Sequence, residues 1–227
     1  MNSRTFDLST TPLREVNAAL HDRGIDGEYT IVGPAGAHNV AVGVDAPVQI
    51  TVEGHVGYYA GGMNQQAEIT IAGNAGTGVA ENMMSGIVVV KGNASQSAGA
   101  TAHGGLLVIE GDAAARCGIS MKGVDIVVGG NVGHGSAFMA QAGRLVVRGN
   151  AGDGLGDSIY ETRIYVRGSV SSLGADCVMK AMSDEHVEEL RGLLKAAGYG
   201  DDDPRSYTRY GSARTLYHFH SDNVSAY

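Results

Sequence analysis

Tryptophan is absent from this chain of 227 residues, while phenylalanine occurs three times and proline four times. The large aromatic side chains that dominate many cores are therefore scarce, which favours a core of small side chains. No apolar run reaches the length that a transmembrane helix needs, and residues 1–13 lack the apolar centre of a signal peptide. These absences predict a cytoplasmic protein without a membrane partner.

Cysteine and positive charge are also scarce. The two cysteines, Cys117 and Cys177, form no C-x-x-C pattern, so a disulfide framework is not expected. Cys117 stands directly before a small corner residue, and a buried thiol is the simpler interpretation than a nucleophile. Sixteen Lys and Arg residues against 24 Asp and Glu give a net charge of −8. Without a basic stripe to neutralise phosphates, a nucleic-acid partner is not expected.

Glycine is abundant and regularly spaced. Seven of the 35 glycines follow one another at a constant 19-residue interval and are called marker glycines below: Gly54, Gly73, Gly92, Gly111, Gly130, Gly149 and Gly168. Aliphatic residues stand two and four positions before each marker glycine. A fixed period near 20 is typical of a solenoid, and apolar residues two apart indicate strands. The repeat predicts an all-β fold, a right-handed parallel β-helix with 19-residue coils and short terminal helices.

Three further columns of the repeat support stacked coils. The residue one position after the marker is mostly Asn or Asp, which can share hydrogen bonds from coil to coil. The residue seven positions after it is always Gly or Ala, as a tight corner requires. The residue ten positions after it is mostly apolar and is predicted to face inward. These inward positions are Asn64, Met83, Ala102, Met121, Ala140 and Ile159.

The repeat divides the chain into three parts. Residues 1–27 form an N-terminal extension, in which Pro12 and the apolar residues after it predict a helix that ends near Gly24. Residues 28–175 form the β-helix. Residues 176–227 hold a second helix, beginning at Ser183 and ending at Gly198, and an aromatic tail.

No motif that could carry chemistry is complete. Residues 152–156 (GDGLG) lack the helix that a phosphate-binding loop would need after them. His218 and His220 offer two ligands, which do not make a metal site. His55, His103 and His134 fall in different columns and do not stack. We therefore predict no catalytic, cofactor-binding or metal-binding residue in this chain.

One outward-facing column is unexpectedly apolar and is called the outer column below. It stands three residues before each marker glycine and comprises Thr51, Thr70, Val89, Val108, Val127, Val146 and Tyr165. An exposed apolar stripe of this size is normally covered. The cover could be the chain's own second helix or a partner subunit, which makes Val89, Val108, Val127 and Val146 candidate interface residues.

The aromatic tail is the second candidate interface. Its residues Tyr207, Tyr210, Tyr217 and Phe219 are of the types that anchor interfaces. We expect residues 205–227 to lie along a partner subunit. The alternative is that the tail folds back over the Val89–Val146 stripe of its own coils.

These features carry a family resemblance. Over residues 28–180, the coil repeat and its Gly152-x-Gly154-x-Gly156 run resemble the GXGXG β-helix domain of glutamate synthase large subunits. The start of the chain, residues 6–13 (FDLSTTPL), and its length are more similar to the free-standing version of that domain. That version is the middle subunit of the three-subunit N-methylglutamate synthase.

The resemblance implies a structural subunit with no active site of its own, within an enzyme complex. That complex would transfer methylamine onto glutamate and release ammonia. It implies a hetero-oligomer with a class II glutamine amidotransferase-like subunit and an FMN-containing glutamate-synthase-like subunit. FMN, and an iron–sulfur cluster as a second cofactor, are expected in the latter partner and none in this chain.

Other interpretations stay open on sequence alone. A similar β-helix occurs in glutamate synthase proper and in formylmethanofuran dehydrogenase. A stand-alone solenoid that binds a polymer such as a sugar chain would need a row of exposed aromatic residues. Tyr58, Tyr59, Tyr160 and Tyr165 stand at the two ends of the repeat without a row between them, which weighs against that alternative.

Overall fold

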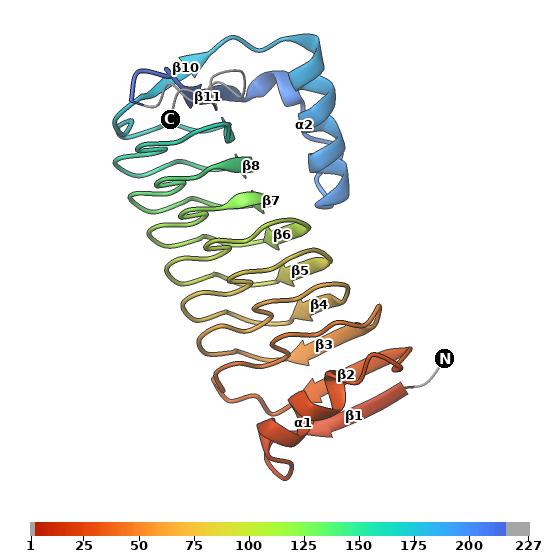
Figure 1. Cartoon of the computed structure of the whole chain (residues 1–227). Coiled ribbons are helices and arrows are strands. Elements are labelled where there is room, and N and C mark those ends of the chain that lie inside the picture. Colours follow the sequence, from red (N-terminus) through yellow and green to blue (C-terminus); the bar gives the residue numbers. More distant parts are fainter. Residues whose placement is uncertain (1–2, 217–227) are drawn as a thin grey trace, which may run out of the picture.

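The fold is a parallel β-solenoid of about seven turns with two short α-helices, seen in a computed structural model that describes residues 3–216 (Figure 1). One 11-stranded sheet runs the length of the molecule in the order β1-β2-β3-β4-β5-β6-β7-β8-β9-β11-β10. The strands of the coils are β2 (Glu28–Val32), β3 (Gln49–Glu53), β4 (Glu68–Ile71), β5 (Ile87–Val90), β6 (Leu106–Ile109), β7 (Lys122–Val128), β8 (Ala142–Val147) and β9 (Arg163–Val166). The predicted all-β parallel solenoid is confirmed.

The strands pair in the register that the repeat predicts. Ile69 of β4 lies opposite Val88 of β5, which lies opposite Leu107 of β6, so paired residues stand one repeat apart in the chain. A second line of parallel bridges, also at 19-residue steps, joins Val56 to Ala75 and continues to Val170. Every coil is thus bonded to its neighbours on two sides, and equivalent side chains stack.

Stacked aliphatic side chains fill the core. Ile69, Ile71 and their equivalents in β3 to β9 are at most 1% exposed. The column ten residues after the markers is fully buried, as predicted. Its single polar member, Asn64, is satisfied inside the coil, because its amide donates to the Ala67 carbonyl at 2.8 Å and accepts from the Ala67 N–H at 3.2 Å.

The marker glycines lie where coils approach most closely. The N–H of Gly149 donates to the carbonyl of Gly130 at 2.9 Å, and the same bond repeats along the column. The adjacent Asn and Asp side chains form a parallel ladder: Asn131 Oδ1 accepts from the N–H of Asn150 at 2.8 Å. A Cβ at Gly149 would lie 2.5 Å from that Oδ1 and 2.6 Å from the Gly130 carbonyl oxygen. Glycine is needed here for space, not for its backbone angles.

The turns that follow the second line of bridges use left-handed backbone at alternate positions. Residues five, seven and nine positions after each of the six markers from Gly54 to Gly149 have positive φ, for example Tyr59 (61°), Gly61 (63°) and Met63 (53°) in one coil. The middle position is always Gly or Ala because it faces the packed core, as Gly61 does against Val88. The predicted tight corner is therefore part of a longer turn, called the turn face below, which spans positions four to eleven after each of these six markers.

The N-terminal end of the sheet begins inside the predicted extension. Strand β1 (Ser3–Asp7) pairs in parallel with β2, although sequence reasoning assigned no strand to residues 1–27. It was missed because its paired positions, such as Ser3 and Glu28, have a 25-residue spacing that does not match the 19-residue period. Helix α1 (Leu13–Leu20) follows and buries Val16 and Leu20 against the core.

The other end is closed by an antiparallel element. Strand β11 (Thr208–Ser212) pairs with β9 on one side and with β10 (Cys177–Lys180) on the other, antiparallel to both. Helix α2 (Asp184–Ala196) and a short 3-10 helix (Pro204–Ser206) connect β10 to β11. Ser183 caps α2 as predicted, with His186 completing a capping box. None of the helices among residues 3–216 has the length and apolar character that crossing a membrane demands.

Candidate interaction surface

Helix α2 covers the C-terminal part of the outer column. Val127, Val146 and Tyr165 are fully buried in a second, smaller core with Leu190, Leu194 and Tyr207. Figure 1 shows α2 running beside the coils of β7 and β8. Over these coils the cover is the chain's own helix, the first of the two alternatives, and Val127 and Val146 are not open to a partner.

The remaining outer-column residues become more exposed toward the N-terminus. Val108 is buried, Val89 and Thr70 are half-buried, and Thr51 is exposed. The apolar character of the column thus follows its burial: Val and Tyr lie under or near α2, and Thr lies where no helix covers the sheet. Of the four candidate valines, Val89 alone keeps appreciable exposure.

A carboxylate on α2 holds the helix to strands β8 and β9. Glu189 accepts hydrogen bonds from Arg144 Nε at 3.0 Å, Arg163 Nη1 at 2.6 Å and the Tyr165 hydroxyl at 2.6 Å. Partial burial would raise the pKa of Glu189, but the tyrosine hydroxyl and the two guanidinium groups outweigh it and lower that pKa. Glu189 is therefore held ionised against the sheet, and we call this group the upper clamp.

A second carboxylate repeats the arrangement beyond the helix. Asp202 accepts from Arg148 at 2.7 and 3.0 Å, from Arg167 Nη1 at 3.1 Å and from the Tyr207 hydroxyl at 2.8 Å. The bidentate bond from Arg148 is the main reason that the pKa of Asp202 falls to about 2. Arg148 also lies over the Tyr199 ring, 3.9 Å from its centre. We call this group the lower clamp.

Sequence reasoning missed both clamps, although a signal was present. Arg144 and Arg163 stand one repeat apart in the chain, and so do Arg148 and Arg167. Two stacked pairs of like charges beside an apolar column indicate that carboxylates must lie opposite them. The partner carboxylates belong to a non-repeating segment, so the repeat could not identify them.

Part of the aromatic tail packs against its own chain. Tyr207 is 4% exposed in the core beneath α2, and Tyr210 is 8% exposed against the main core at the end of the solenoid. These two residues face their own coils in the described structure. Tyr217 and Phe219 lie outside the described residues, and a partner contact for them stays a prediction.

The cysteine and histidine side chains that the sequence offers for catalysis or metal binding form no common metal site within residues 3–216. Cys117 and Cys177 are buried free thiols, and burial raises their pKa values to about 12 and about 11. His55 belongs to the amide ladder, where its Nδ1 accepts from the N–H of Asn74 at 2.9 Å. Within residues 3–216 no three His, Cys, Asp or Glu side chains gather in a metal-binding arrangement. Gly154 and Gly156 occupy positive-φ positions of the turn face.

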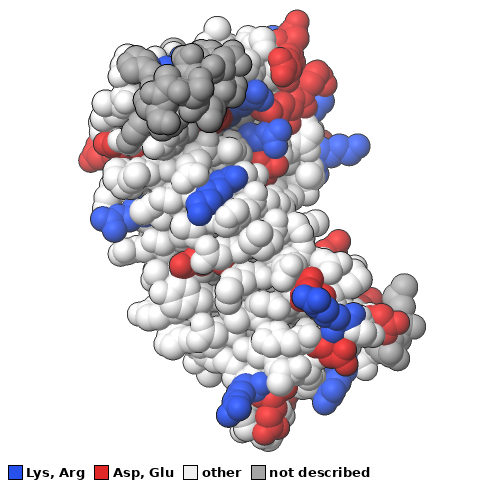
Figure 2. Space-filling model, viewed as in Figure 1, with Lys and Arg blue, Asp and Glu red and all other residues white. Residues whose placement is uncertain are grey.

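The turn face carries the large apolar side chains that the solenoid leaves exposed along its coils. Six of them lie four to eleven positions after a marker and are 36 to 51% exposed: Tyr58, Tyr59, Met63, Met84, Phe138 and Met139. Tyr59, Met63 and Met139 also have left-handed backbone, which disfavours bulky side chains. Figure 2 shows that charged side chains gather toward the two ends of the molecule and are sparse over the coils between them.

Comparison with known proteins gives one informative match. The chain is 59% identical over 225 residues to Protein GlxC of Rhizobium meliloti (strain 1021), covering 98% of this chain and 99% of that protein. The chain belongs to the GlxC family. No family model matches it, and neither does any solved structure. Because the match covers nearly all of the R. meliloti GlxC, the repeated coils, the two clamps and the C-terminal cap fall within the shared length.

Proposed function

We propose that the chain is a structural, non-catalytic subunit of a cytoplasmic glutamate-synthase-like complex, and that N-methylglutamate synthase is that complex. The chemistry, methylamine plus glutamate giving N-methylglutamate and ammonia, would take place on partner chains. One partner would be amidotransferase-like, and the other would bind FMN and an iron–sulfur cluster. This chain would hold them in place.

The observation that carries the proposal is the filled, doubly capped solenoid. Stacked aliphatic side chains occupy the interior, so the coils enclose no room for a substrate. Helix α1 with β1 covers one end, and the antiparallel pair β10 and β11 covers the other. What the fold offers to other molecules is its rigid outer surface, as a scaffold requires.

Two further findings support a separate subunit of this kind. The GXGXG resemblance links the coils to glutamate synthases, where the β-helix supports the catalytic domains. The match to the R. meliloti GlxC covers 99% of that protein, which supports the same fold for essentially the whole of that relative. A scaffold domain that stands as its own chain must be joined to its partners by non-covalent contacts.

The turn face is the surface that we propose for those contacts. Methionine and aromatic residues are enriched at protein interfaces, and this face exposes six of them. Met63 and Met139 occupy the same column, four coils apart, each with left-handed backbone. A partner lying along the turn face would cover both.

Affinity purification from cells that express the tagged chain at its native level tests the proposal. We expect an amidotransferase-like protein and a yellow flavoprotein to co-purify in stoichiometric amounts. The purified assembly should form N-methylglutamate from methylamine and glutamate. Recovery of molybdenum or tungsten and iron–sulfur subunits would assign the chain to a formylmethanofuran dehydrogenase-like complex. Recovery of the chain alone would overturn the scaffold function.

A matched pair of variants tests the turn face. Met139→Glu places a charge on the turn face, and Thr51→Glu places one at the exposed end of the outer column. Both positions are accessible, so both variants should fold. We expect Met139→Glu to lose the co-purifying subunits and Thr51→Glu to keep them. The reverse result would indicate that partners bind at the outer column instead of the turn face.

A further inference from the structure

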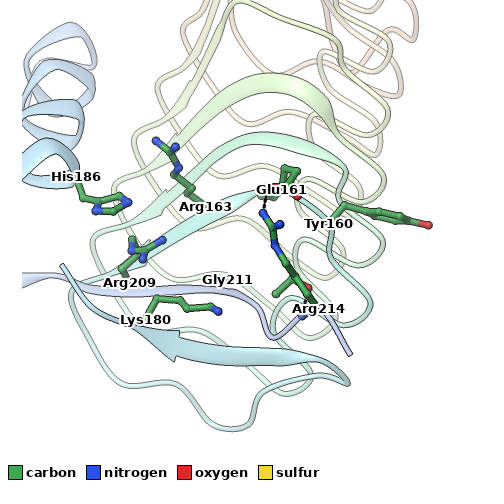
Figure 3. A pocket seen from close by; sticks show the side chains of 10 residues that line it. Tyr160, Glu161, Arg163, Lys180, His186, Arg209, Gly211 and Arg214 are labelled. Carbon is green, nitrogen blue, oxygen red and sulfur yellow. Dashed lines mark hydrogen bonds and ion pairs between the residues drawn. The ribbon is translucent and has the colours of Figure 1, made fainter. Parts of the chain in front are cut away.

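A polar hollow of about 230 Å³ lies at the C-terminal end of the solenoid. Strands β9, β10 and β11 and the start of α2 surround it, and a single water occupies only about 30 Å³. Figure 3 shows Arg163, Lys180, Arg209 and His186 around one part of the hollow, with Arg214 and Glu161 paired at another and Tyr160 pointing away. The space is large enough for a small ligand, and its walls are mostly basic.

The positive charge in the hollow is only partly neutralised. Arg214 pairs with Glu161 at 2.8 Å, and Arg163 pairs with Glu189 of the upper clamp at 2.6 Å.

Among the described residues 3–216, the other two cations have no carboxylate partner. Arg209 donates its Nε to the neutral carbonyl of Ala181 at 2.9 Å, and Lys180 forms no ion pair with any residue in the range 3–216. A protein of net charge −8 thus places two uncompensated cations beside each other in a hollow.

A buried hydroxyl in the wall of the hollow lacks a partner within residues 3–216. Thr162 is 2% exposed, and its Oγ1 makes no hydrogen bond to that part of the chain. Buried hydroxyl groups are nearly always hydrogen-bonded, since leaving one unpaired is unfavourable. Thr162 lines the same hollow as Lys180 and Arg209, but its Oγ1 is buried in the wall and does not open into the hollow.

His186 adds a further donor on the helix side. Its Nδ1 accepts the N–H of Ser183 at 3.2 Å as part of the α2 capping box. Burial first, and then the charges of Arg209 and Arg163, lower the pKa of His186. The neutral ring therefore carries its proton on Nε2, which can donate to an acceptor.

We propose that this hollow is a binding site for a small oxyanion, a phosphate or carboxylate group, held by Lys180 and Arg209. Ammonium and guanidinium groups are the donors that proteins use for such anions. His186 and the free nitrogens of Arg163 complete a ring of donors. The site belongs to this chain alone and does not depend on the proposed complex.

Isothermal titration calorimetry on the full-length chain tests the site, with inorganic phosphate and succinate as separate probes at constant ionic strength. We expect saturable binding of at least one probe, and the preferred probe identifies the anion class. Lys180→Ala should weaken binding at least tenfold. Lys195→Ala removes the same charge from the exposed last turn of α2 and should leave binding unchanged. No saturable binding of either probe, or equal loss in both variants, would overturn the proposal.

Thr162→Val separates a ligand-binding role from a structural one. The substitution keeps the shape of the side chain and removes the unpartnered hydroxyl, so the melting temperature without anion should stay the same or rise. We expect anion binding to stay unchanged, because the buried hydroxyl does not open into the hollow. Weaker anion binding in this variant would show that the Thr162 side chain turns into the site when the anion binds.

Discussion

Gly149 illustrates how a single residue type is fixed by its neighbours in the next coil. Its amide bonds to the Gly130 carbonyl, and the Asn131 side chain lies where a Cβ would project. The marker glycines and the amide ladder therefore depend on each other. The glycines let the backbones of adjacent coils come close enough for the Asn and Asp side chains to bridge them. Neither column could change alone without disturbing the other.

Gly149→Ala should be destabilising by about 1–3 kcal/mol, since the added methyl meets backbone atoms that cannot move aside. The Cβ would lie 2.6 Å from the Gly130 carbonyl oxygen. Gly192→Ala is the control, because Gly192 lies within α2 with nothing inside 4 Å of an added Cβ. It should stabilise the protein by about 0.5–1 kcal/mol. Urea unfolding of both variants measures the difference, and equal effects would refute the close-approach argument.

Helix α2 is an element held by apolar and ionic contacts acting together. Leu190 and Leu194 cover Val127, Val146 and Tyr165, while the upper clamp fixes the middle of the helix and the lower clamp fixes the segment that follows it. In each clamp, one carboxylate binds two arginines from adjacent coils and one tyrosine hydroxyl. The apolar contacts supply most of the attraction, and the clamps set where along the outer column the helix lies.

Glu189→Ala should cost about 1–3 kcal/mol, because it leaves the buried Tyr165 hydroxyl without its acceptor. Arg144 and Arg163 are 37% and 38% exposed, so water can solvate them and limit the loss. Glu188→Ala, one residue away, removes only an exposed pair with Arg191 and should change stability by less than about 0.5 kcal/mol. Thermal unfolding of the two variants is the measurement. Similar losses in both would show that the upper clamp contributes nothing specific.

Acid should loosen the segment through Asp202. Its pKa is lowered from 3.8 to about 2, so its contribution to stability is complete above about pH 4 and is lost as the pH falls toward 2. Melting temperatures of the unmodified chain and of Asp202→Asn between pH 7 and pH 2 check this. The gap between the two proteins should close over that window, and a gap that stays constant would place the acid-sensitive group elsewhere.

The sequence predicts helix α2 well, but it does not predict the clamp partners or strand β1. The position of α2 follows from Ser183 and the spacing of Val187, Leu190 and Leu194, and the apolar outer column indicates that something covers it. The partners of the clamps do not follow, since Glu189 and Asp202 look like ordinary surface acids until the helix is placed on the sheet. Strand β1 was missed for a related reason: its 25-residue spacing from β2 falls outside the period.

At the scale of the whole molecule, the solenoid was predictable because one pattern is repeated seven times. Each coil needs only its neighbours, so the period, the register and the inward columns can all be read from local sequence. The caps occur once each, and their contacts join residues far apart in the chain, as Arg214 joins Glu161. The hollow with its unpaired cations lies within such a cap, which is why no motif indicated it.

The isolated chain should bind neither flavin nor metal and should catalyse no reaction by itself. The scaffold proposal places FMN and the iron–sulfur cluster on a partner. Absorbance in the visible flavin bands and elemental analysis of the purified full-length protein check this. A yellow protein, or stoichiometric iron or zinc, would mean that the scaffold proposal is incomplete.

From β3 to β9, the inward-facing aliphatic residues of adjacent strands are 19 residues apart, so the number of coils sets the length of the solenoid. Adjacent strands are about 4.8 Å apart. The distance between the end covered by α1 and the end covered by β10 and β11 therefore changes in equal steps with the number of coils. Adding or removing one whole coil would preserve the core columns and the amide ladder and shift the two ends by one step. A change of any other length would have to be taken up in a turn, as in the 21-residue step from β2 to β3. Evolution can therefore adjust the span between partners bound near the two ends only in whole coils.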